Sequence, residues 1–285
     1  FILYRFDTDK KNAGHAADLA KEECLKGKKL IVAGGGDGTV NEIVNGIFKA
    51  GANGNVSLLI APIGTGNDAA LGLGIGHEED ACRAYSEGNI HRIDVGFITF
   101  RNSKGQNVQR YYIGDAGLGF TGKVCNDVRY FKKIKPIGKY AYQATIIALL
   151  LAQYRCTPIK LELDGQPPVE KVSFFVDVYN NIFGGGGIRP APNAKMDDGK
   201  LDVIFTGKVG TIEALKMLKQ FEKGTHLSHP AIDQYLVDTV KVSGDNLFVW
   251  ADGEVLGRTV NNEPVTFSVI PKSLDVFYLK GKAEA

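Results

Sequence analysis

The stretch that decides the fold reads VAGGGDGTVNE and runs from residue 32 to residue 42. It joins the end of an apolar strand to three glycines, and a helical pattern begins directly after them. A helix N-terminus has unpaired N–H groups and a partial positive charge, and glycine lets the backbone approach an anion closely. The stretch therefore predicts a phosphate-binding turn in which the Thr39 hydroxyl could reach a phosphate. The Asp37 carboxylate would repel phosphates unless Mg²⁺ or a nucleotide hydroxyl lay between them. The alternative is an ordinary strand-to-helix turn that Asp37 or Thr39 caps.

A second turn of the same kind reads IAPIGTGND and covers residues 60–68. Like the first turn, it leads from an apolar strand through glycines into the start of a helix. In a parallel sheet both turns lie at the carboxyl ends of strands, where ligands bind, so we expect them to form one site. The first turn lacks the G-x-x-x-x-G-K-[ST] and G-x-G-x-x-G patterns, which excludes a Walker-type loop and a dinucleotide fingerprint.

The pattern of apolar residues divides the chain into two halves. Residues 1–95 alternate short apolar strands with helical patterns, which predicts an α/β domain with a parallel sheet and crossover helices. From residue 96 onward strand-like stretches dominate, among them residues 172–179, 265–270 and 274–279. Helical patterns occur there only near residues 120–131, 139–154 and 211–223. Residues 96–285 therefore predict a β-rich, sandwich-like domain.

Composition excludes several classes of protein. The chain has 285 residues, of which 44% are hydrophobic and 23% charged, as in ordinary globular proteins. Its net charge of +2 is not that of a nucleic-acid-binding protein, and its longest strongly apolar run, residues 144–152, is far shorter than the ~20 residues of a membrane-spanning helix. Four widely spaced cysteines favour a reducing compartment over a disulfide framework. The chain begins at Phe1, inside a strand-like pattern, so we expect preceding residues to be missing.

Five motifs follow one another along the chain: GGDGT at residues 35–39, PIGTGND at 62–68, RIDV at 92–95, PNAKMDDGKL at 192–201 and ADGE at 251–254. This order resembles the diacylglycerol kinase catalytic-domain family, which includes bacterial lipid kinases and sphingosine kinases. GGDGT alone is less specific, because NAD kinases share it. The resemblance implies an ATP-dependent kinase whose first domain has an NAD-kinase-like α/β form, with the nucleotide in the cleft between the domains. One departure is the lack of the family's N-P-x-x-G phosphate loop before Gly14.

The resemblance also implies roles for individual residues. Glu254 would be the catalytic base and Asp252 would belong to the water or metal network, since the acceptor hydroxyl must lose its proton. Alternation along an extended chain would point both carboxylates to one side, although Asp-Gly is also a strong hairpin signal. A Mg²⁺ ion would be held by the Asp198 side chain and the main-chain oxygens of Lys195 and Lys200. The nucleotide-contacting residues would be Asp37, Gly38, Thr39, Gly64, Thr65, Gly66, Asn67, Asp68, Ala69, Ala70 and His91.

The acceptor and the cellular location are less determined by the residues. The basic run at residues 123–139 precedes the apolar run at 144–152, which suits docking on an anionic membrane face; a core helix with a solvated basic loop is the alternative. The resemblance implies a lipid kinase that uses ATP and Mg²⁺ to convert diacylglycerol to phosphatidic acid. Such a kinase would be cytoplasmic and peripheral to the inner face of the membrane, without a transmembrane segment or a nucleic-acid partner.

Two other functions and several other acceptors stay open. An NAD kinase is one alternative, and a non-catalytic nucleotide- or lipid-binding module is the other. Phosphatidylglycerol, a sphingoid base and a polyprenol each offer a hydroxyl on an apolar body, and no residue pattern separates them from diacylglycerol. An exposed strand edge in the β-rich half could pair two copies into a homodimer.

Overall fold

The computed structural model describes residues 14–134, 140–153 and 155–280. For residues 129–134, 140–143 and 153 it describes the backbone alone. The strand expected at residues 1–6 lies outside the described residues, and so do most side chains of the basic run at 123–139.

The N-terminal half begins with two parallel strands flanked by helices. β1 (Leu30–Gly35) and β2 (Ser57–Pro62) pair from end to end, so their carboxyl ends lie level with each other. The helices are α1 (His15–Leu25), α2 (Asp37–Lys49), α3 (Asp68–Gly72) and α4 (Glu78–Glu87). Their apolar residues share one core with the strands. The expected α/β architecture is confirmed, and α4 is a helix that the sequence pattern did not predict.

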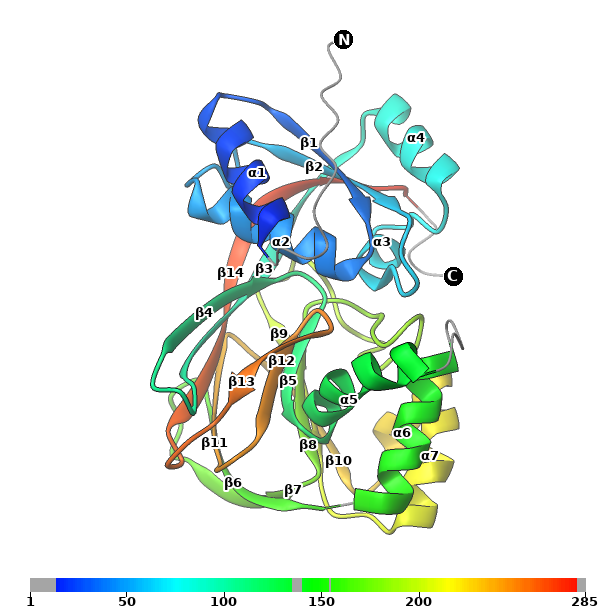
Figure 1. Ribbon diagram of the computed structural model, residues 1–285, viewed down its shortest axis with the longest axis vertical. Coiled ribbons are helices and arrows are strands. Elements are labelled where there is room, and N and C mark those ends of the chain that lie inside the picture. Colours follow the sequence, from blue (N-terminus) through cyan, green and yellow to red (C-terminus); the bar gives the residue numbers. More distant parts are fainter. Residues whose placement is uncertain (1–13, 135–139, 154, 281–285) are drawn as a thin grey trace.

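Two long strands run between the halves of the molecule (Figure 1). β3 (Ile90–Arg101) and β14 (Pro264–Phe277) pair antiparallel over most of their length. Near its end, β14 also pairs in parallel with β2. The first sheet therefore has the order β1-β2-β14-β11-β6-β7, with β3 on β14 and β4 on β3, and it is mixed because the last strand of the chain returns to it. The division expected at residue 95 falls inside β3 and stays a prediction.

The second sheet is antiparallel and has the order β10-β9-β8-β5-β12-β13. Its strands are β5 (Asp115–Gly119), β8 (Phe175–Tyr179), β9 (Leu201–Thr206), β10 (Ile232–Val237), β12 (Phe248–Ala251) and β13 (Glu254–Arg258). The remaining strands of the first sheet are β4 (Asn107–Tyr112), β6 (Thr157–Leu163), β7 (Val169–Ser173) and β11 (Thr239–Ser243). Leu118 and Val176 of the second sheet share a core with Val240 and Phe267 of the first. The expected β-rich, sandwich-like half is confirmed.

Three helices cover the outer face of the second sheet (Figure 1). They are α5 (Phe120–Ile134), α6 (Tyr140–Gln153) and α7 (Thr211–Lys223), and a short 3-10 turn (His226–Ser228) follows α7. Phe175 and Ile204 of the sheet share a core with Val124, Leu149 and Met217 of the three helices. Among the described residues, no helix is both long enough and apolar enough to cross a membrane.

Two strand boundaries differ from the sequence pattern. Residues 172–179, expected as one strand, divide at Phe174, where the chain passes from the first sheet to the second. The N–H of Phe174 donates to the carbonyl of Thr206 (2.8 Å), so the crossing residue keeps a backbone partner. Conversely, residues 265–270 and 274–279 contribute to a single strand, β14, whose register against β3 shifts between Ile270 and Leu274. The interruption in the apolar pattern therefore marks a register shift.

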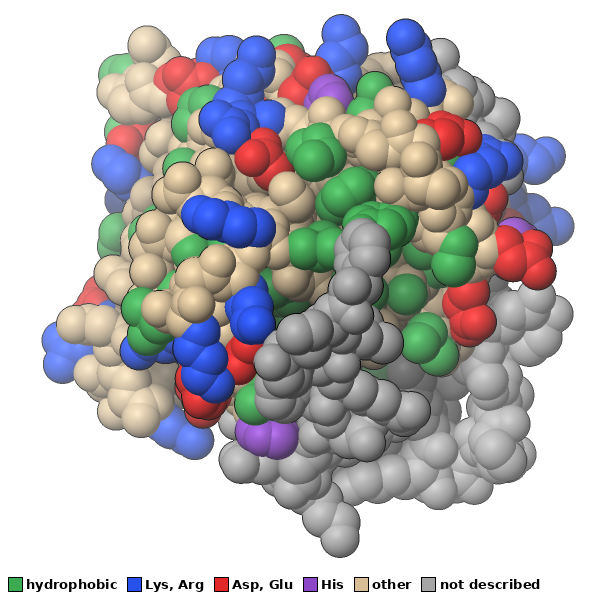
Figure 2. All heavy atoms as spheres, turned by 90° about the horizontal axis from the view of Figure 1, so that it is seen from above, with side chains coloured by type: hydrophobic (Ala, Val, Ile, Leu, Met, Phe, Trp, Pro, Cys, Tyr) green, Lys and Arg blue, Asp and Glu red, His purple; other side chains and the backbone are tan. Residues whose placement is uncertain are grey.

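The face at the N-terminal end of the molecule carries charges of both signs (Figure 2). Basic and acidic side chains are interspersed around its edge, and hydrophobic side chains gather near its middle. The part of this face that the structure describes is therefore mixed in charge, in keeping with the small net charge of the chain.

Candidate active site

At the ends of β1 and β2, the two glycine turns lie in direct contact. A Cβ atom added to Gly64 would lie 2.3 Å from the Cα atom of Gly36, a distance that real side chains do not reach. The N–H of Ile63 donates to the carbonyl of Gly35 (3.2 Å), which joins the turns by their backbones. The turns therefore meet as closely as they do because both contact positions are glycine.

Asp37, the first residue of α2, holds the second turn in place. Its carboxylate accepts hydrogen bonds from the N–H groups of Asn67 (2.9 Å) and Ala69 (3.1 Å). Asn67 has a φ of 59°, and its side-chain amide bonds both the N–H and the carbonyl of Gly64. The aspartate of the first turn thus fixes the shape of the second, whatever else it contacts.

Asp68 ties the N-terminal half to the second half of the chain. Its carboxylate accepts hydrogen bonds from the N–H groups of Gly186 (2.8 Å) and Gly187 (2.6 Å). Both glycines have φ near +90°, a conformation that other residues rarely adopt. The backbone carbonyl of Asp68 accepts a further bond from the Asn181 side chain (2.8 Å). Burial, and next the Asp37 carboxylate, raise the pKa of Asp68 to about 6.

A cavity, called here the carboxylate cavity, opens between these turns and the second sheet. It has about 920 Å³ of space, part of it open to solvent. Among its lining residues are Asp37, Thr65, Gly66, Asp68 and Ala69 on one side, and Gly114, Asp115, Gly185, Gly186, Asp252 and Gly253 on the other. The other expected nucleotide residues do not line it. Gly38 and Thr39 lie in the first turn of α2, Gly64 and Asn67 lie in the second glycine turn, and Ala70 lies in α3.

Asp252 and Gly253 form the two-residue turn of the β12–β13 hairpin. Ala251 pairs with Glu254, and the two turn residues have φ of 42° and 76°. The expectation of an extended chain with both carboxylates on one side is wrong, because Asp-Gly adopts the left-handed backbone that such hairpin turns require. The carboxylates of Asp252 and Glu254 therefore have different surroundings.

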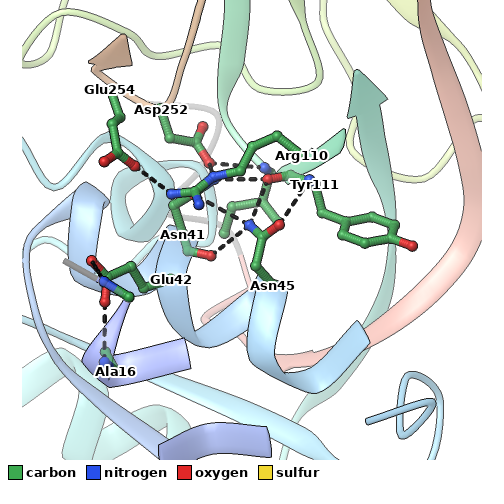
Figure 3. A network of polar contacts seen from close by, with 10 residues as sticks. Ala16, Asn41, Glu42, Asn45, Arg110, Tyr111, Asp252 and Glu254 are labelled. Carbon is green, nitrogen blue, oxygen red and sulfur yellow. Dashed lines mark hydrogen bonds and ion pairs between the residues drawn. The ribbon is translucent and has the colours of Figure 1, made fainter. Parts of the chain in front are cut away.

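The Asp252 side chain is buried and anchors the tip of this hairpin (Figure 3). Its two oxygens accept four hydrogen bonds, one from the Asn41 side chain (2.7 Å) and three from the N–H groups of Ile113, Gly114 and Asp115 (3.0–3.2 Å). Burial raises the pKa of Asp252, and the donated hydrogen bonds oppose that rise. The carboxylate thus joins α2, the β4–β5 connection and the hairpin.

Glu254 points to a different partner, the guanidinium of Arg110 on β4 (Figure 3). The Glu254 side chain is 35% exposed and that of Arg110 is 18% exposed. Gly253, its neighbour, lines the carboxylate cavity, but Glu254 does not. Glu254 therefore lies next to a residue of the cavity wall and has a cationic partner.

Two further polar residues of α2 join parts of the fold. Asn45 exchanges hydrogen bonds with the backbone of Tyr111, accepting from its N–H (3.0 Å) and donating to its carbonyl (2.9 Å). Glu42 accepts from the N–H groups of Gly14 and Ala16 (both 3.1 Å) and so caps the start of α1. These contacts position α2 against β4 and α1 (Figure 3).

A second cavity, called here the apolar cavity, lies between the second sheet and helices α5–α7. It has about 750 Å³ of space, part of it open to solvent. Its lining is mainly hydrophobic and includes Phe120, Val124, Ile146, Leu150, Phe174, Phe175, Val209, Met217, Leu218 and Phe221. It shares Asp115, Gly185 and Trp250 with the carboxylate cavity. A molecule with a long apolar body could therefore lie in one cavity while its polar end reaches the other.

Comparison with known proteins identifies relatives over nearly the whole chain. The model of the diacylglycerol kinase catalytic domain matches residues 3–98, and that of the YegS C-terminal NAD kinase beta sandwich-like domain matches residues 117–278. The diacylglycerol kinase of Bacillus subtilis (strain 168) is 31% identical over 277 residues, which cover 95% of this chain and 85% of that protein. The chain belongs to the diacylglycerol kinase family. A YegS-like lipid kinase of Chromohalobacter salexigens is 32% identical over 210 residues, which cover 72% of this chain and 62% of that protein.

Solved structures agree on the fold of this diacylglycerol kinase family member. A diacylglycerol kinase from Bacillus anthracis str. Sterne has a TM-score of 0.67 at 21% identity, covering 95% of this chain and 84% of that one. Yeast NADH kinase complexed with NADH has a TM-score of 0.52 at 10% identity, covering 91% of this chain and 64% of that one. At these identities the likeness concerns the fold alone. The expected resemblance to NAD kinases in fold is thereby confirmed, and the family is one of lipid phosphotransferases.

In this family member, Asp94 holds the loop in which magnesium is expected. Its carboxylate accepts hydrogen bonds from the N–H groups of Gly199 (2.6 Å) and Lys272 (2.7 Å), and its own N–H donates to the carbonyl of Met196 (2.6 Å). The sequence pattern placed Asp94 in a motif but gave it no role. Its role in the structure is to fix the loop against β3 and β14.

The expected magnesium ligands themselves are loosely assembled. Asp198 is exposed, and its carboxylate accepts the N–H of Lys200 (3.0 Å). Within the described ranges, no group of three or more His, Cys, Asp and Glu side chains could hold a metal ion. A magnesium ion at Asp198, Lys195 and Lys200 would depend on main-chain oxygens and water, and it stays a prediction.

His91 lies at this loop and does not line the carboxylate cavity. Its Nε2 atom is 3.3 Å from the Asp197 carboxylate, and its ring packs edge-on against Tyr278. The expected contact between His91 and a nucleotide therefore stays a prediction.

Asp115 is a candidate that the sequence pattern missed. It lies where the two cavities meet, and its pKa is raised well above the usual range by burial and, next, by the Asp252 carboxylate. Its one signal in the sequence was its place in the glycine-rich stretch at residues 114–122.

The acidic wall of the carboxylate cavity fits a nucleotide bound together with a cation better than a free triphosphate. Asp37, Asp68, Asp115 and Asp252 bring four acidic side chains to it, and those that are ionised would repel a triphosphate unless a cation lay between them. Space at the turn also depends on glycine. A Cβ atom at Gly66 would lie 2.8 Å from the Asp37 carboxylate, so glycine keeps the turn open beside this carboxylate. Mg²⁺ prefers oxygen ligands, but the four acidic side chains do not form a group of three that could hold an ion, so phosphate oxygens and water would complete its coordination.

Proposed function

We propose that this protein transfers the γ-phosphoryl group of ATP to the hydroxyl of diacylglycerol and so forms phosphatidic acid. The observation that carries the proposal is the junction of the two cavities at Asp115, Gly185 and Trp250. A lipid whose acyl chains occupy the apolar cavity would bring its free hydroxyl to this junction. A nucleotide in the carboxylate cavity would bring its terminal phosphate to the same place.

The nucleotide would be held by the two glycine turns, which comprise Asp37, Gly38 and Thr39 and residues 64–70. Magnesium, when bound, would neutralise charge on the phosphates and polarise them. The protein's own contribution is position. Asp37 and Asp68 are fixed by backbone N–H groups, so the turns are set before a nucleotide binds.

We propose Glu254 as the group that takes the proton of the acceptor hydroxyl. Asp252 is poorly suited to this role, since four donated hydrogen bonds already occupy its two oxygens. Glu254 is partly exposed and has one guanidinium partner, so an oxygen of its carboxylate stays available. Asp252 would instead position the hairpin tip, and through it Glu254.

We further propose a cytoplasmic protein that attaches to the inner face of the membrane. Ile147 and Leu151 on α6 and Ile212 on α7 are 42%, 67% and 73% exposed. Because α6 and α7 also cover the apolar cavity, a lipid could pass between the bilayer and the cavity near these residues. Co-sedimentation with vesicles that contain anionic lipid tests this attachment.

We also propose a homodimer. It is supported by the edge strand β7, where Val169 and Val172 are 54% and 50% exposed.

The test of the function is transfer of labelled γ-phosphate from ATP and Mg²⁺ to a panel of acceptors. The panel contains diacylglycerol, phosphatidylglycerol, a sphingoid base, a polyprenol and NAD. We expect labelled phosphatidic acid and no labelled NADP, because the apolar cavity suits acyl chains and not a second nucleotide. Labelled NADP, or no labelled product from a protein that binds ATP, would refute the proposal.

A further inference from the structure

The apolar cavity contains one buried carboxylate that the proposed transfer does not use. Asp177, in the middle of β8, is 1% exposed and lines the cavity. Its carboxyl oxygens accept hydrogen bonds from the hydroxyls of Thr121 (2.7 Å) and Tyr179 (3.2 Å). The indole N–H of Trp250 in turn donates to Thr121 (3.0 Å). All four side chains line the cavity, so a connected polar strip crosses its largely hydrophobic wall.

The neighbouring strand leaves room for this carboxylate. Gly117 of β5 lies opposite Asp177, and a Cβ atom at Gly117 would lie 2.0 Å from Oδ1 of Asp177. Any side chain at residue 117 would therefore displace the carboxylate. The hydrogen-bond partners of Asp177 are uncharged, and burial raises its pKa to about 8. At neutral pH the group therefore carries a proton and can donate a hydrogen bond.

A second polar group faces the same cavity. Thr206 on β9 is 1% exposed and lines the cavity, and its hydroxyl has no hydrogen-bond partner among the described residues. Thr206 pairs with Phe175 and Asp177 pairs with Ile204, so both polar groups lie on one face of the sheet. A buried hydroxyl without a partner is unfavourable, and a ligand that accepts its hydrogen bond would remove that cost.

Two of the polar groups on this wall can donate a hydrogen bond into the cavity. The Thr206 hydroxyl and the Asp177 carboxyl proton both need an acceptor, and an ester carbonyl is an acceptor only. An ammonium group, as in a sphingoid base, is a donor only and matches the wall less well. We infer that Asp177 and Thr206 recognise the ester carbonyls of an acylglycerol, Asp177 through its carboxyl proton and Thr206 through its hydroxyl. This inference rests on the proposed function, because it places the acceptor in the apolar cavity.

The experiment compares two acceptors with matched chains, a diacylglycerol and its dialkyl ether analogue, which lacks both carbonyls. The kcat/KM of each is measured in the same detergent micelles, at saturating ATP and pH 7. We expect the wild-type protein to prefer the ester at least fivefold, the factor that one ordinary hydrogen bond contributes. In Asp177→Leu this preference should fall to the two- to threefold that Thr206 alone supplies, and in Asp177→Asn, which keeps a donor, it should stay close to that of wild type.

Thr206→Val removes the second donor without a change of shape. Because it removes a hydroxyl that has no partner, it should fold at least as well as wild type, and its ester preference should fall two- to threefold. The matched control is Asp202→Asn on the same strand as Thr206. Asp202 is also a buried carboxyl group, but its partner is the Gln234 side chain (2.6 Å) and it does not line the apolar cavity. The ester preference of Asp202→Asn should equal that of wild type.

The outcomes separate this inference from the proposed function. Two outcomes refute the inference and leave the lipid kinase standing, provided that wild type phosphorylates diacylglycerol. In the first, Thr206→Val and Asp177→Leu keep the full ester preference of wild type. In the second, wild type itself shows no ester preference. Faster phosphorylation of a sphingoid base than of diacylglycerol also refutes it and indicates an ammonium partner for Asp177. If wild type phosphorylates no acylglycerol, both the inference and the proposed acceptor are refuted.

Discussion

The contact between the two glycine turns gives a sharp prediction for Gly64→Ala. The new methyl group would lie 2.3 Å from the Cα atom of Gly36 and 2.9 Å from its nitrogen, and neither backbone atom can rotate away. The turns must separate by roughly 1 Å to restore ordinary van der Waals contact. Overpacking of this kind costs about 1–3 kcal/mol of stability. A shift of about 1 Å in a positioned reactant lowers rates by about 10²-fold.

The matched control is Gly38→Ala in the same candidate site. Nothing lies within 4 Å of a Cβ atom at Gly38, which is in the first turn of α2. Alanine should therefore leave the free protein as stable as wild type or up to about 1 kcal/mol more stable. If ATP approaches the helix at this position, Gly38→Ala will raise the KM for ATP without lowering the melting temperature.

The assay pairs thermal unfolding of the free protein with steady-state kinetics in ATP. Gly64→Ala should melt several degrees below wild type, at about 2–4 °C per kcal/mol for a chain of this size. Its kcat/KM for ATP should fall by about 10²-fold. A variant with the melting temperature of wild type and a kcat/KM within twofold of it would show that the turns are not held in contact, and the argument from their geometry would be wrong.

Three more predictions follow from single side chains. Glu254→Gln should lower kcat by about 10²–10⁴-fold, as expected for loss of a general base, while the KM for ATP changes less than threefold in steady-state assays; wild-type turnover would point to another base. Asp68→Asn weakens the bonds to Gly186 and Gly187, so hydrogen exchange at residues 184–187 should accelerate while that of β8 does not; unchanged exchange would contradict the link. The pKa of Asp177 is about 8 in the native state and ~4 in the unfolded chain, so the native state binds the proton more tightly. The free energy of unfolding should therefore fall as pH rises from about 4 to about 8. In urea unfolding, Asp177→Asn should make this fall smaller than in wild type, by about 5 kcal/mol at most. An equal fall in both proteins would exclude a neutral Asp177.

The elements that the sequence predicted well are those with a strong local signal. β1, α2 and β2 follow from short apolar runs, glycine turns and helical periodicity, and each of these is a property of neighbouring residues. α4 was missed because half of its sequence, EEDACRAYSE, is charged and its buried apolar residues are only the alanines Ala81 and Ala84. β5 was missed because its sequence, DAGLG, has little strand propensity. Its place between β8 and β12 forms it, and that pairing joins residues far apart in the chain.

The candidate site likewise has parts that the sequence predicts and parts that depend on contacts between distant residues. Its two turns could be predicted because glycine density marks close approach of the backbone. The partners of those turns could not, since Asp68 bonds residues more than a hundred positions away. Asp177 looks like an ordinary polar residue in a strand pattern, and Asp115 looks like a polar residue in a glycine-rich loop. Only the packing of α5–α7 on the second sheet shows that both face a cavity.

The polar contacts around the carboxylate cavity explain how two halves of the chain can present one site. β3 and β14 join the halves as continuous strands, but neither strand lines the carboxylate cavity. At the cavity itself, Asp252 bonds Asn41 across the halves, and Asp68 bonds the backbone of Gly186 and Gly187. Each of these carboxylates accepts backbone N–H groups, so its position is set without a ligand. A nucleotide would therefore meet acidic groups that are already fixed, and the protein would spend little binding energy on their arrangement.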